Sequence, residues 1–130
     1  MPYVCMARIV RSLNGIGKSV KDAKVLVLGV AYKNDIDDTR ESPALKLIEL
    51  LRADGANAMF HDPHVAELPQ FGLRSVPLDD ETLAAADCVA IVTAHSSVDY
   101  GRVVDRASLV ADFRNATGPH GTRNGHVHKL

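Results

Sequence analysis

The chain has 130 residues, of which 46% are hydrophobic and 24% are charged, values typical of one globular domain. Its formal net charge of −1 gives no basic excess for binding nucleic acid or an anionic membrane. No apolar run approaches the roughly 20 residues that a membrane-spanning helix needs. Cys5 and Cys88 form no CxxC pair, so we expect two free thiols and no zinc or redox motif. These features predict a cytoplasmic domain that binds neither nucleic acid nor membrane.

The first half of the chain alternates helical and strand patterns. Residues 3–14 carry apolar side chains at helical spacing, and the dipeptide at 14–15 ends this helix. The apolar run at 25–30 is typical of a strand covered on both faces of a parallel sheet. After a polar loop, Ser42 is placed to cap a helix and Pro43 to begin it, with a stop at Gly55.

The second half continues the same alternation with shorter elements. We expect strands at 57–61, 87–93 and 108–112, and helices at 78–86, capped by Asp79 or Asp80, and at 100–107. Residues 64–78 look mostly like loop, and 127–130 fit either a last short strand or a loose tail. Because strands alternate with helices, the pattern predicts βαβ units and a parallel, doubly wound α/β sheet.

In such sheets, ligands bind beyond the carboxyl ends of the strands. The loop that follows the first strand, residues 31–41, lacks the glycines of a GxGxxG dinucleotide fingerprint, since only Gly29 stands near the strand end. It does carry Lys33 and Arg40, which are cations able to bind phosphate, and it leads into a helix N-terminus. The alternative is a solvated loop whose charges pair among themselves.

The turn HDPH at residues 61–64 has three readings. A structural Asx-Pro turn is favoured. A metal corner is weakly suggested by its two histidines, and Asp62 could instead bond a ribose hydroxyl, as an acid that ends the second strand often does. We predict no metal site in this chain.

Two residues that follow later strands are candidates for polar roles. His95 is expected to be a hydrogen-bonding loop histidine; a Ser-His-Asp hydrolase is disfavoured because the chain has no GxSxG elbow. Arg114 can stack on a base or bind a phosphate, or it can pair with Asp112 or the C-terminal region.

The C-terminal segment is rich in Gly, His, Asn and Arg. Its histidines are too widely spread to form a convincing metal tract, and we expect them at the surface: His120, His126 and His128.

With these residues laid out, the stretch KVLVLGVAYKNDIDDTRESPALKLIELL resembles the C-terminal UDP-binding domain of the UDP-glucose/GDP-mannose dehydrogenase family. The shared pattern is a strand, G-x-A-[YF]-K, D-[DT]-R-E-S-P and then a helix. The later segments HDPHV, IVTAHSSVDY and DFRNA match in the same order, and the first two are similar to the branch that oxidises UDP-N-acetylhexosamines. The opening MPYVCMARIVRSLN looks like the end of the helix that joins the family's central domain to this one.

The resemblance implies a function. Members of the family oxidise C6 of a nucleotide sugar from alcohol to carboxylate in two NAD-dependent steps and supply polysaccharide biosynthesis. Their N-terminal Rossmann domain binds NAD, and an upstream cysteine is the nucleophile. Carried over to this chain, Tyr32, Lys33 and Arg114 would contact UDP, and Arg40 would reach toward the NAD of the other domain.

We therefore expect a three-layer, Rossmann-like α/β domain with a parallel sheet and a leading N-terminal helix. Residues 1–20 would be the end of the interdomain helix and a linker, and 21–130 the UDP-binding domain. Its partners would be a UDP-sugar and the N-terminal and central domains of a parent enzyme, which we expect to be a homo-oligomer. The chain alone would hold no catalytic residue and would be inactive.

Two alternatives of other classes stay open. One is a free-standing interaction or regulatory module without nucleotide, which dimerises through residues 4–13. The other is a phosphate-binding enzyme that acts alone.

Overall fold

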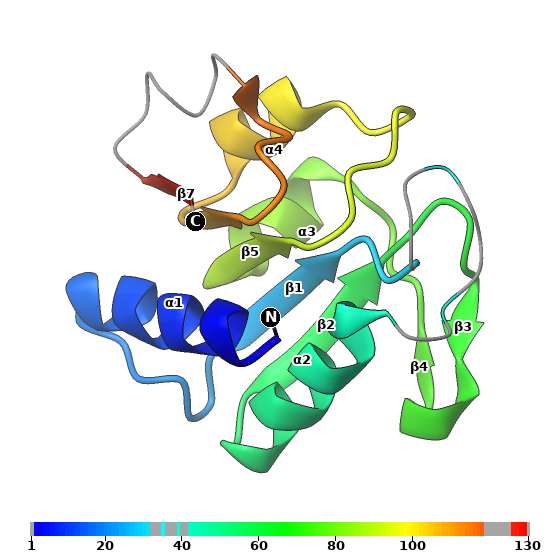
Figure 1. Cartoon of the computed structure of the whole chain (residues 1–130). Coiled ribbons are helices and arrows are strands. Elements are labelled where there is room, and N and C mark those ends of the chain that lie inside the picture. Colours follow the sequence, from blue (N-terminus) through cyan, green and yellow to red (C-terminus); the bar gives the residue numbers. More distant parts are fainter. Residues whose placement is uncertain (1, 32–34, 36–38, 40–41, 119–125, 130) are drawn as a thin grey trace.

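A computed structural model describes residues 2–31, 35, 39, 42–118 and 126–129. Their centre is a five-stranded, wholly parallel sheet in the order β2-β1-β5-β6-β7 (Figure 1). The strands are β1 (Lys24–Leu28), β2 (Asn57–His61), β5 (Cys88–Ile91), β6 (Val110–Asp112) and β7 (Val127–Lys129). The predicted parallel α/β sheet is confirmed. None of the helices in these residues is both long and apolar enough to cross a membrane.

Helices cover both faces of the sheet, which makes three layers. Helices α1 (Pro2–Gly15) and α2 (Pro43–Ala53) pack with one set of strand side chains, and α3 (Asp80–Ala85) and α4 (Tyr100–Arg106) pack with the other. In the sheet, β2 lies on one side of β1, and β5, which comes later in the chain, lies on the other side of β1. The strand order therefore reverses between β1 and β5, and the carboxyl ends of these two strands mark the usual ligand position of such a sheet.

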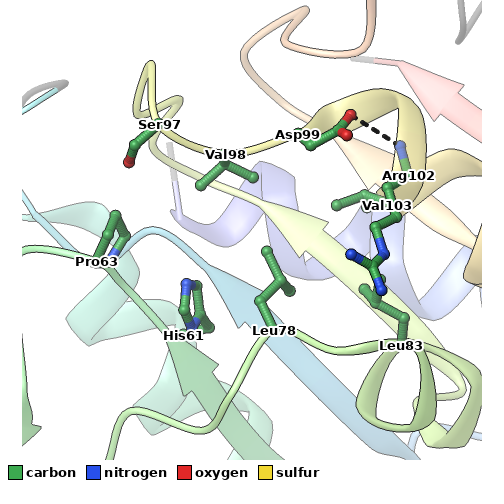
Figure 2. A pocket seen from close by; sticks show the side chains of 9 residues that line it. All are labelled: His61, Pro63, Leu78, Leu83, Ser97, Val98, Asp99, Arg102 and Val103. Atoms are coloured by element: carbon green, nitrogen blue, oxygen red, sulfur yellow. Dashed lines mark hydrogen bonds between the residues drawn. The ribbon is translucent and has the colours of Figure 1, made fainter.

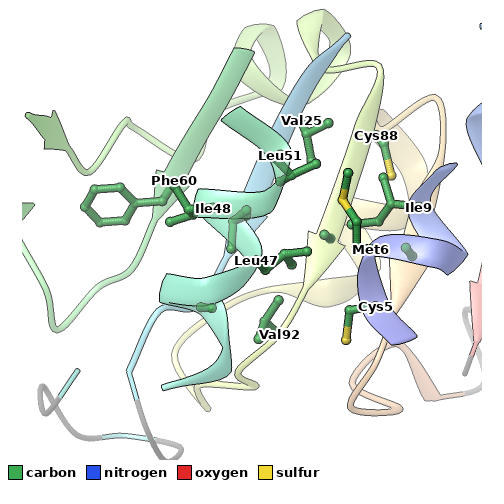
Figure 3. Close-up of a cluster of buried hydrophobic side chains, with 14 of the residues drawn as sticks. Cys5, Met6, Ile9, Val25, Leu47, Ile48, Leu51, Phe60, Cys88 and Val92 are labelled. Atoms are coloured by element: carbon green, nitrogen blue, oxygen red, sulfur yellow. The ribbon is translucent and has the colours of Figure 1, made fainter. Parts of the chain in front are cut away.

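The apolar face of α1 belongs to the same core as the sheet. Cys5, Met6, Ile9 and Leu13 are buried, and they join side chains from the inner face of α2 in one cluster (Figure 3). Helical spacing puts these four residues on one stripe, which explains the pattern seen in the sequence. The opposite surface exposes larger apolar groups: Tyr3 (63%), Val4 (51%) and, just after the helix, Ile16 (47%).

The start of α2 follows the sequence prediction. The hydroxyl of Ser42 accepts a hydrogen bond from the backbone N–H of Ala44 at 3.2 Å, and Pro43 is the first helical residue. An N-cap satisfies one of the helix's unpaired N–H groups, and the fixed φ of proline suits this position. The helix ends as expected before Gly55, whose φ is +86°.

The region expected to be mostly loop contains a small hairpin. Strands β3 (Glu67–Leu68) and β4 (Leu73–Arg74) pair antiparallel around a short 3₁₀ helix, Pro69–Phe71. Strands of two residues are too short to produce an alternating hydrophobic pattern, so no local signal indicated them.

The C-terminal segment forms a strand, β7, and its histidines are more enclosed than expected. His126 donates from Nε2 to the carbonyl of Val104 at 2.7 Å, and His128 Nδ1 lies 2.7 Å from the hydroxyl of Ser12. Both side chains are half-buried, so the expectation that these two lie at the surface is wrong. Their bonds to α4 and α1 hold the edge strand in place. His120 lies outside the described residues.

Candidate functional site

The carboxyl ends of β1 and β5 lie in direct contact at the point where the strand order reverses. Gly29 has a φ of +88°, and a Cβ atom at this position would lie 2.2 Å from the carbonyl oxygen of Thr93. The hydroxyl of Thr93 donates to the carbonyl of Ala31 at 2.7 Å. Only glycine permits this approach of the two backbones, so Gly29 serves sheet packing here.

Asp62 is a buried acceptor at the end of β2. Its Oδ2 accepts hydrogen bonds from the N–H groups of Val30 (2.8 Å) and Ala31 (3.2 Å), and its Oδ1 accepts from the N–H of His64 (2.8 Å). The bond to His64 closes the Asx-Pro turn and confirms that reading of the sequence. Because Asp62 is 3% exposed and both of its carboxylate oxygens accept hydrogen bonds from the protein, the structure disfavours the alternative in which it bonds a ribose hydroxyl.

His95 connects Asp62 to the loop that follows β1. The ring is 1% exposed; its Nε2 lies 2.8 Å from Asp62 Oδ2, and its Nδ1 accepts from the N–H of Asp35 at 2.7 Å. The Asp35 carboxylate in turn accepts from the N–H and hydroxyl of Ser96, and these two bonds lower the pKa of Asp35. The predicted hydrogen-bonding role of His95 is confirmed. Ser96 bonds Asp35 rather than the imidazole, so the described residues here hold no Ser–His pair of the hydrolase kind.

Three possible metal ligands gather at this point: Asp35, His64 and His95, whose ligand atoms lie within 4.8 Å of one another. The two imidazole rings meet edge to face, with centroids 4.7 Å apart. However, both ring nitrogens of His95 already have hydrogen-bond partners, so a metal would have to displace the N–H of Asp35. The other histidine of the HDPH turn, His61, bonds the carbonyl of Val76 instead. The geometry favours a hydrogen-bonded cluster over a metal centre.

A second buried carboxylate shapes the turn after β6. Asp112 accepts from the N–H groups of Arg114, Ala116 and Thr117 and, at 2.6 Å, from the hydroxyl of Thr117. Burial alone would raise the pKa of Asp112, but these hydrogen bonds outweigh it and hold the pKa below its usual value. Within the described part of the chain, the side chain of Arg114 is exposed and makes no ion pair. The alternative pairing of its guanidinium with Asp112 is therefore not found.

The remaining predicted site residues, Tyr32, Lys33 and Arg40, lie outside the described residues. Their neighbours Ala31, Asp35 and Ser42 are described, and all three are hydrogen-bonded at the carboxyl edge of the sheet. The sequence therefore directed attention to an edge at which the structure gathers buried polar contacts. It singled out the cations but missed Asp35 and Ser96, because contacts across 61 residues have no local signal.

A cavity of about 260 Å³ lies near the ends of β2 and β5, toward α3 and α4 (Figure 2). Its apolar lining comes from Leu78, Leu83, Val98 and Val103, and its polar lining includes Arg102, which donates from Nε to Asp80 at 2.7 Å. Arg114 does not line this cavity, whereas His61 and Pro63 of the HDPH turn do. The sequence did not predict it because its walls come from separate segments.

Neither cysteine has the character of a nucleophile. Cys5 and Cys88 are both free and buried. Burial raises the pKa of both thiols, that of Cys88 to about 12. Because the reactive form of cysteine is the thiolate, both side chains are inert at neutral pH.

Comparison with known proteins identifies a family. Residues 26–119 match the model of the UDP-glucose/GDP-mannose dehydrogenase family, UDP binding domain. The UDP-N-acetyl-D-mannosamine dehydrogenase of Methanococcus maripaludis (strain C7) is 33% identical over 95 residues, which are 73% of this chain and 21% of the relative. The corresponding enzyme of Pyrococcus horikoshii is 31% identical over 120 residues, which are 88% of this chain and 27% of the relative. The chain thus spans only about a quarter of these relatives.

Solved structures of dehydrogenases also share the fold of this chain. The NDP-N-acetyl-D-galactosaminuronic acid dehydrogenase of Methanosarcina mazei Go1 superposes with a TM-score of 0.82 at 26% identity. The UDP-D-ManNAc dehydrogenase of Pyrococcus horikoshii superposes with a TM-score of 0.80 at 25% identity. Each match covers 99% of this chain and 28% or 30% of the other. The whole described fold therefore corresponds to one part of these larger proteins.

Proposed function

Because the chain belongs to the UDP-glucose/GDP-mannose dehydrogenase family, we propose that it binds the UDP half of a UDP-sugar within a nucleotide-sugar 6-dehydrogenase. The observation that carries this proposal is the match of residues 26–119 to the UDP binding domain of that family. The resemblance read from the sequence is confirmed. The alternative of a free-standing module that dimerises through residues 4–13 is disfavoured, because the apolar face of α1 is already buried in this chain's own core.

The substrate class follows from the relatives. Those most similar in sequence include UDP-N-acetyl-D-mannosamine dehydrogenases, which supports a UDP-N-acetylhexosamine as the substrate of the parent enzyme. That enzyme would oxidise C6 of the sugar from alcohol to carboxylate. It would act in the cytoplasm as a homo-oligomer and supply polysaccharide biosynthesis.

NAD would be the hydride acceptor of this reaction. Gly29 is packed against Thr93, and the loop that follows β1 lacks the further glycines through which a GxGxxG fingerprint approaches a pyrophosphate. The residues described in this chain therefore do not fit a dinucleotide site of their own. NAD would be held mainly by an N-terminal domain, with Arg40 reaching toward it.

The contribution of this chain is to grip and orient the nucleotide. We assign contact with UDP to Tyr32, Lys33 and Arg114. Lys33 stands two residues before Asp35, and Arg114 two residues after Asp112, and both aspartates are fixed by hydrogen bonds. A cation on an anchored turn, as Arg114 is, loses little conformational entropy when it binds a diphosphate.

The domain boundary is part of the same proposal. Residues 1–20 would be the end of the helix that joins this domain to the central domain, and residues 21–130 the UDP-binding domain. The exposed apolar groups Tyr3, Val4 and Ile16 would then contact the rest of the parent enzyme.

Replacing Lys33 with alanine is expected to weaken UDP binding by about 1.5–3 kcal/mol, the usual contribution of a hydrogen bond to a charged group. Isothermal titration of UDP into both proteins measures the difference. Lys21→Ala is the matched control, because Lys21 is exposed before the amino end of β1, and its affinity should equal that of wild type. Equal affinities of wild type and Lys33→Ala would remove Lys33 from the site.

The isolated chain should not turn over substrate, because we place no catalytic residue in it. Purified protein incubated with NAD and a UDP-sugar is expected to produce no NADH absorbance above a protein-free control. Sustained NADH formation would contradict the assignment of catalysis to other domains and would favour an enzyme that acts alone.

A further inference from the structure

The turn that carries Arg114 is fixed to the sheet on its amino side. The N–H of Phe113 donates to the carbonyl of Ile91 at 3.1 Å, and the Phe113 side chain is 8% exposed. The N–H of Arg114 itself donates to Asp112 Oδ1 at 3.1 Å. The backbone that enters Arg114 is therefore held to β5 and β6, while the Arg114 side chain is exposed.

Lys129 fixes the same turn on its carboxyl side. It is the last residue of β7 and pairs in parallel register with Asp112 of β6. Its Nζ donates to the side-chain oxygen of Asn115 at 2.6 Å and to the backbone carbonyl of Gly118 at 3.2 Å. Asn115, which directly follows Arg114, has a φ of +54°, a left-handed conformation that asparagine tolerates. We call the two bonds of Lys129 the Lys129 clamp.

The acceptors of the Lys129 clamp are both neutral. Within the described part of the chain, Lys129 forms no ion pair, and it is half-buried. An ammonium can only donate, so the amide oxygen of Asn115, and not its nitrogen, faces Lys129. Ordering a lysine side chain costs conformational entropy, and here the bonds that offset this cost are made to the turn rather than to an acidic side chain.

We propose that Lys129 is a positioning residue for nucleotide binding: through Asn115 and Gly118 it holds the turn after β6 so that Arg114 meets the diphosphate of UDP. This inference rests on the proposed function, in which Arg114 contacts UDP. Lys129 does not touch the nucleotide in this arrangement. It lowers the conformational entropy that the turn must lose when the guanidinium binds a phosphate.

Two substitutions break the Lys129 clamp from its opposite ends. Lys129→Met removes the ammonium and keeps a long, unbranched side chain. Asn115→Gly removes the side-chain acceptor, leaves the charge of Lys129 in place and permits the positive φ without strain. The bond to Asn115 is exposed and the bond to Gly118 is half-buried, so both variants should fold, with urea midpoints close to that of wild type.

Both variants should bind UDP about fivefold more weakly than wild type in isothermal titration, the effect of one hydrogen bond of ordinary strength. The double variant should also lose only about fivefold, because each change breaks the same link. Lys21→Met is the matched control, since it removes an exposed lysine before the amino end of β1, and it should bind UDP as wild type does.

The outcomes separate failure of the Lys129 clamp from failure of the proposed function. If wild type binds UDP and Lys129→Met binds it equally well, the positioning role is overturned while the proposed function stands. If Lys129→Met loses affinity but Asn115→Gly does not, the ammonium contacts the diphosphate itself, and the positioning role is again overturned.

Three further results would also count against the inference. A loss of about 25-fold in the double variant would mean that Lys129 and Asn115 act separately. Urea midpoints that fall in proportion to the affinities would show that the role of Lys129 is only structural. If wild type does not bind UDP, the proposed function fails, and the positioning role fails with it.

Discussion

The variant Asp62→Ala is expected to lose roughly 3–5 kcal/mol of the free energy of unfolding, the usual cost of removing one partner from a buried polar pair. The carboxylate accepts from four donors, the N–H groups of Val30, Ala31 and His64 and the Nε2 of His95. Alanine would leave all four without this acceptor inside the protein. Urea unfolding followed by circular dichroism measures the difference, since a single domain of this size unfolds in one cooperative step.

Asp105→Ala is the matched control for this experiment. Asp105 is exposed in α4 and has no hydrogen bond or ion pair with a described side chain. Alanine is the better helix former, so the control should change stability by less than about 1 kcal/mol, in the stabilising direction. A loss for Asp62→Ala no larger than the change in this control would show that the carboxylate does not hold the carboxyl edge together.

The second large effect is expected from Gly29→Ala, which should cost roughly 2–5 kcal/mol, because a left-handed backbone and a steric clash add together. The new Cβ would lie 2.2 Å from the carbonyl oxygen of Thr93 and 2.8 Å from its nitrogen, and both atoms belong to the backbone. Neither atom can move without separating β1 from β5. The same urea unfolding assay gives the difference.

The variant Gly72→Ala separates the cost of the left-handed backbone from the cost of the steric clash. Gly72 also has a positive φ, +66°, but a Cβ there would meet nothing within 4 Å. Its substitution should therefore cost only the backbone term, about 1–2 kcal/mol. Equal losses for the two variants would mean that the contact between the two strand ends contributes nothing.

Much of the fold follows from local patterns in the sequence. The run at 25–30 is continuous and β-branched because β1 is covered on both faces, and the first strand was predicted to within two residues of its bounds, Lys24–Leu28. Ser42 and Pro43 marked the start of α2 because capping chemistry is local. The strand β2 was predicted with the bounds that the structure shows, Asn57–His61.

Features that depend on distant contacts were not predicted. The half-buried state of His126 and His128 arises from their bonds to Val104 and Ser12, which lie far away in the sequence. A polar, histidine-rich tail has the composition of a surface segment, and the local pattern at 127–130 left a short strand and a loose tail both open. The structure has the strand, β7.

The candidate site likewise has features that local patterns predicted and features that depend on distant contacts. The position beyond the strand ends followed from the α/β pattern, and the Asx-Pro turn of Asp62 followed from its residue types. The link from Asp62 through His95 to Asp35 could not be predicted, because it joins three loops whose spacing is set only by the folded sheet. The buried aspartate was read as a possible ribose ligand, and in the structure it holds the backbone at the end of β1 through the N–H groups of Val30 and Ala31.

The most direct test of the central claim is an NMR titration of the uniformly ¹⁵N-labelled chain with UDP. We predict that amide shifts change for residues at the carboxyl edge, among them Ala31, Asp35, Ser96 and Arg114. Amides at the opposite edge, such as Lys24 and Asn57 at the start of β1 and β2, should stay unchanged. Shift changes confined to the opposite edge, or none at saturating UDP, would contradict the assignment of this chain as a UDP-binding domain.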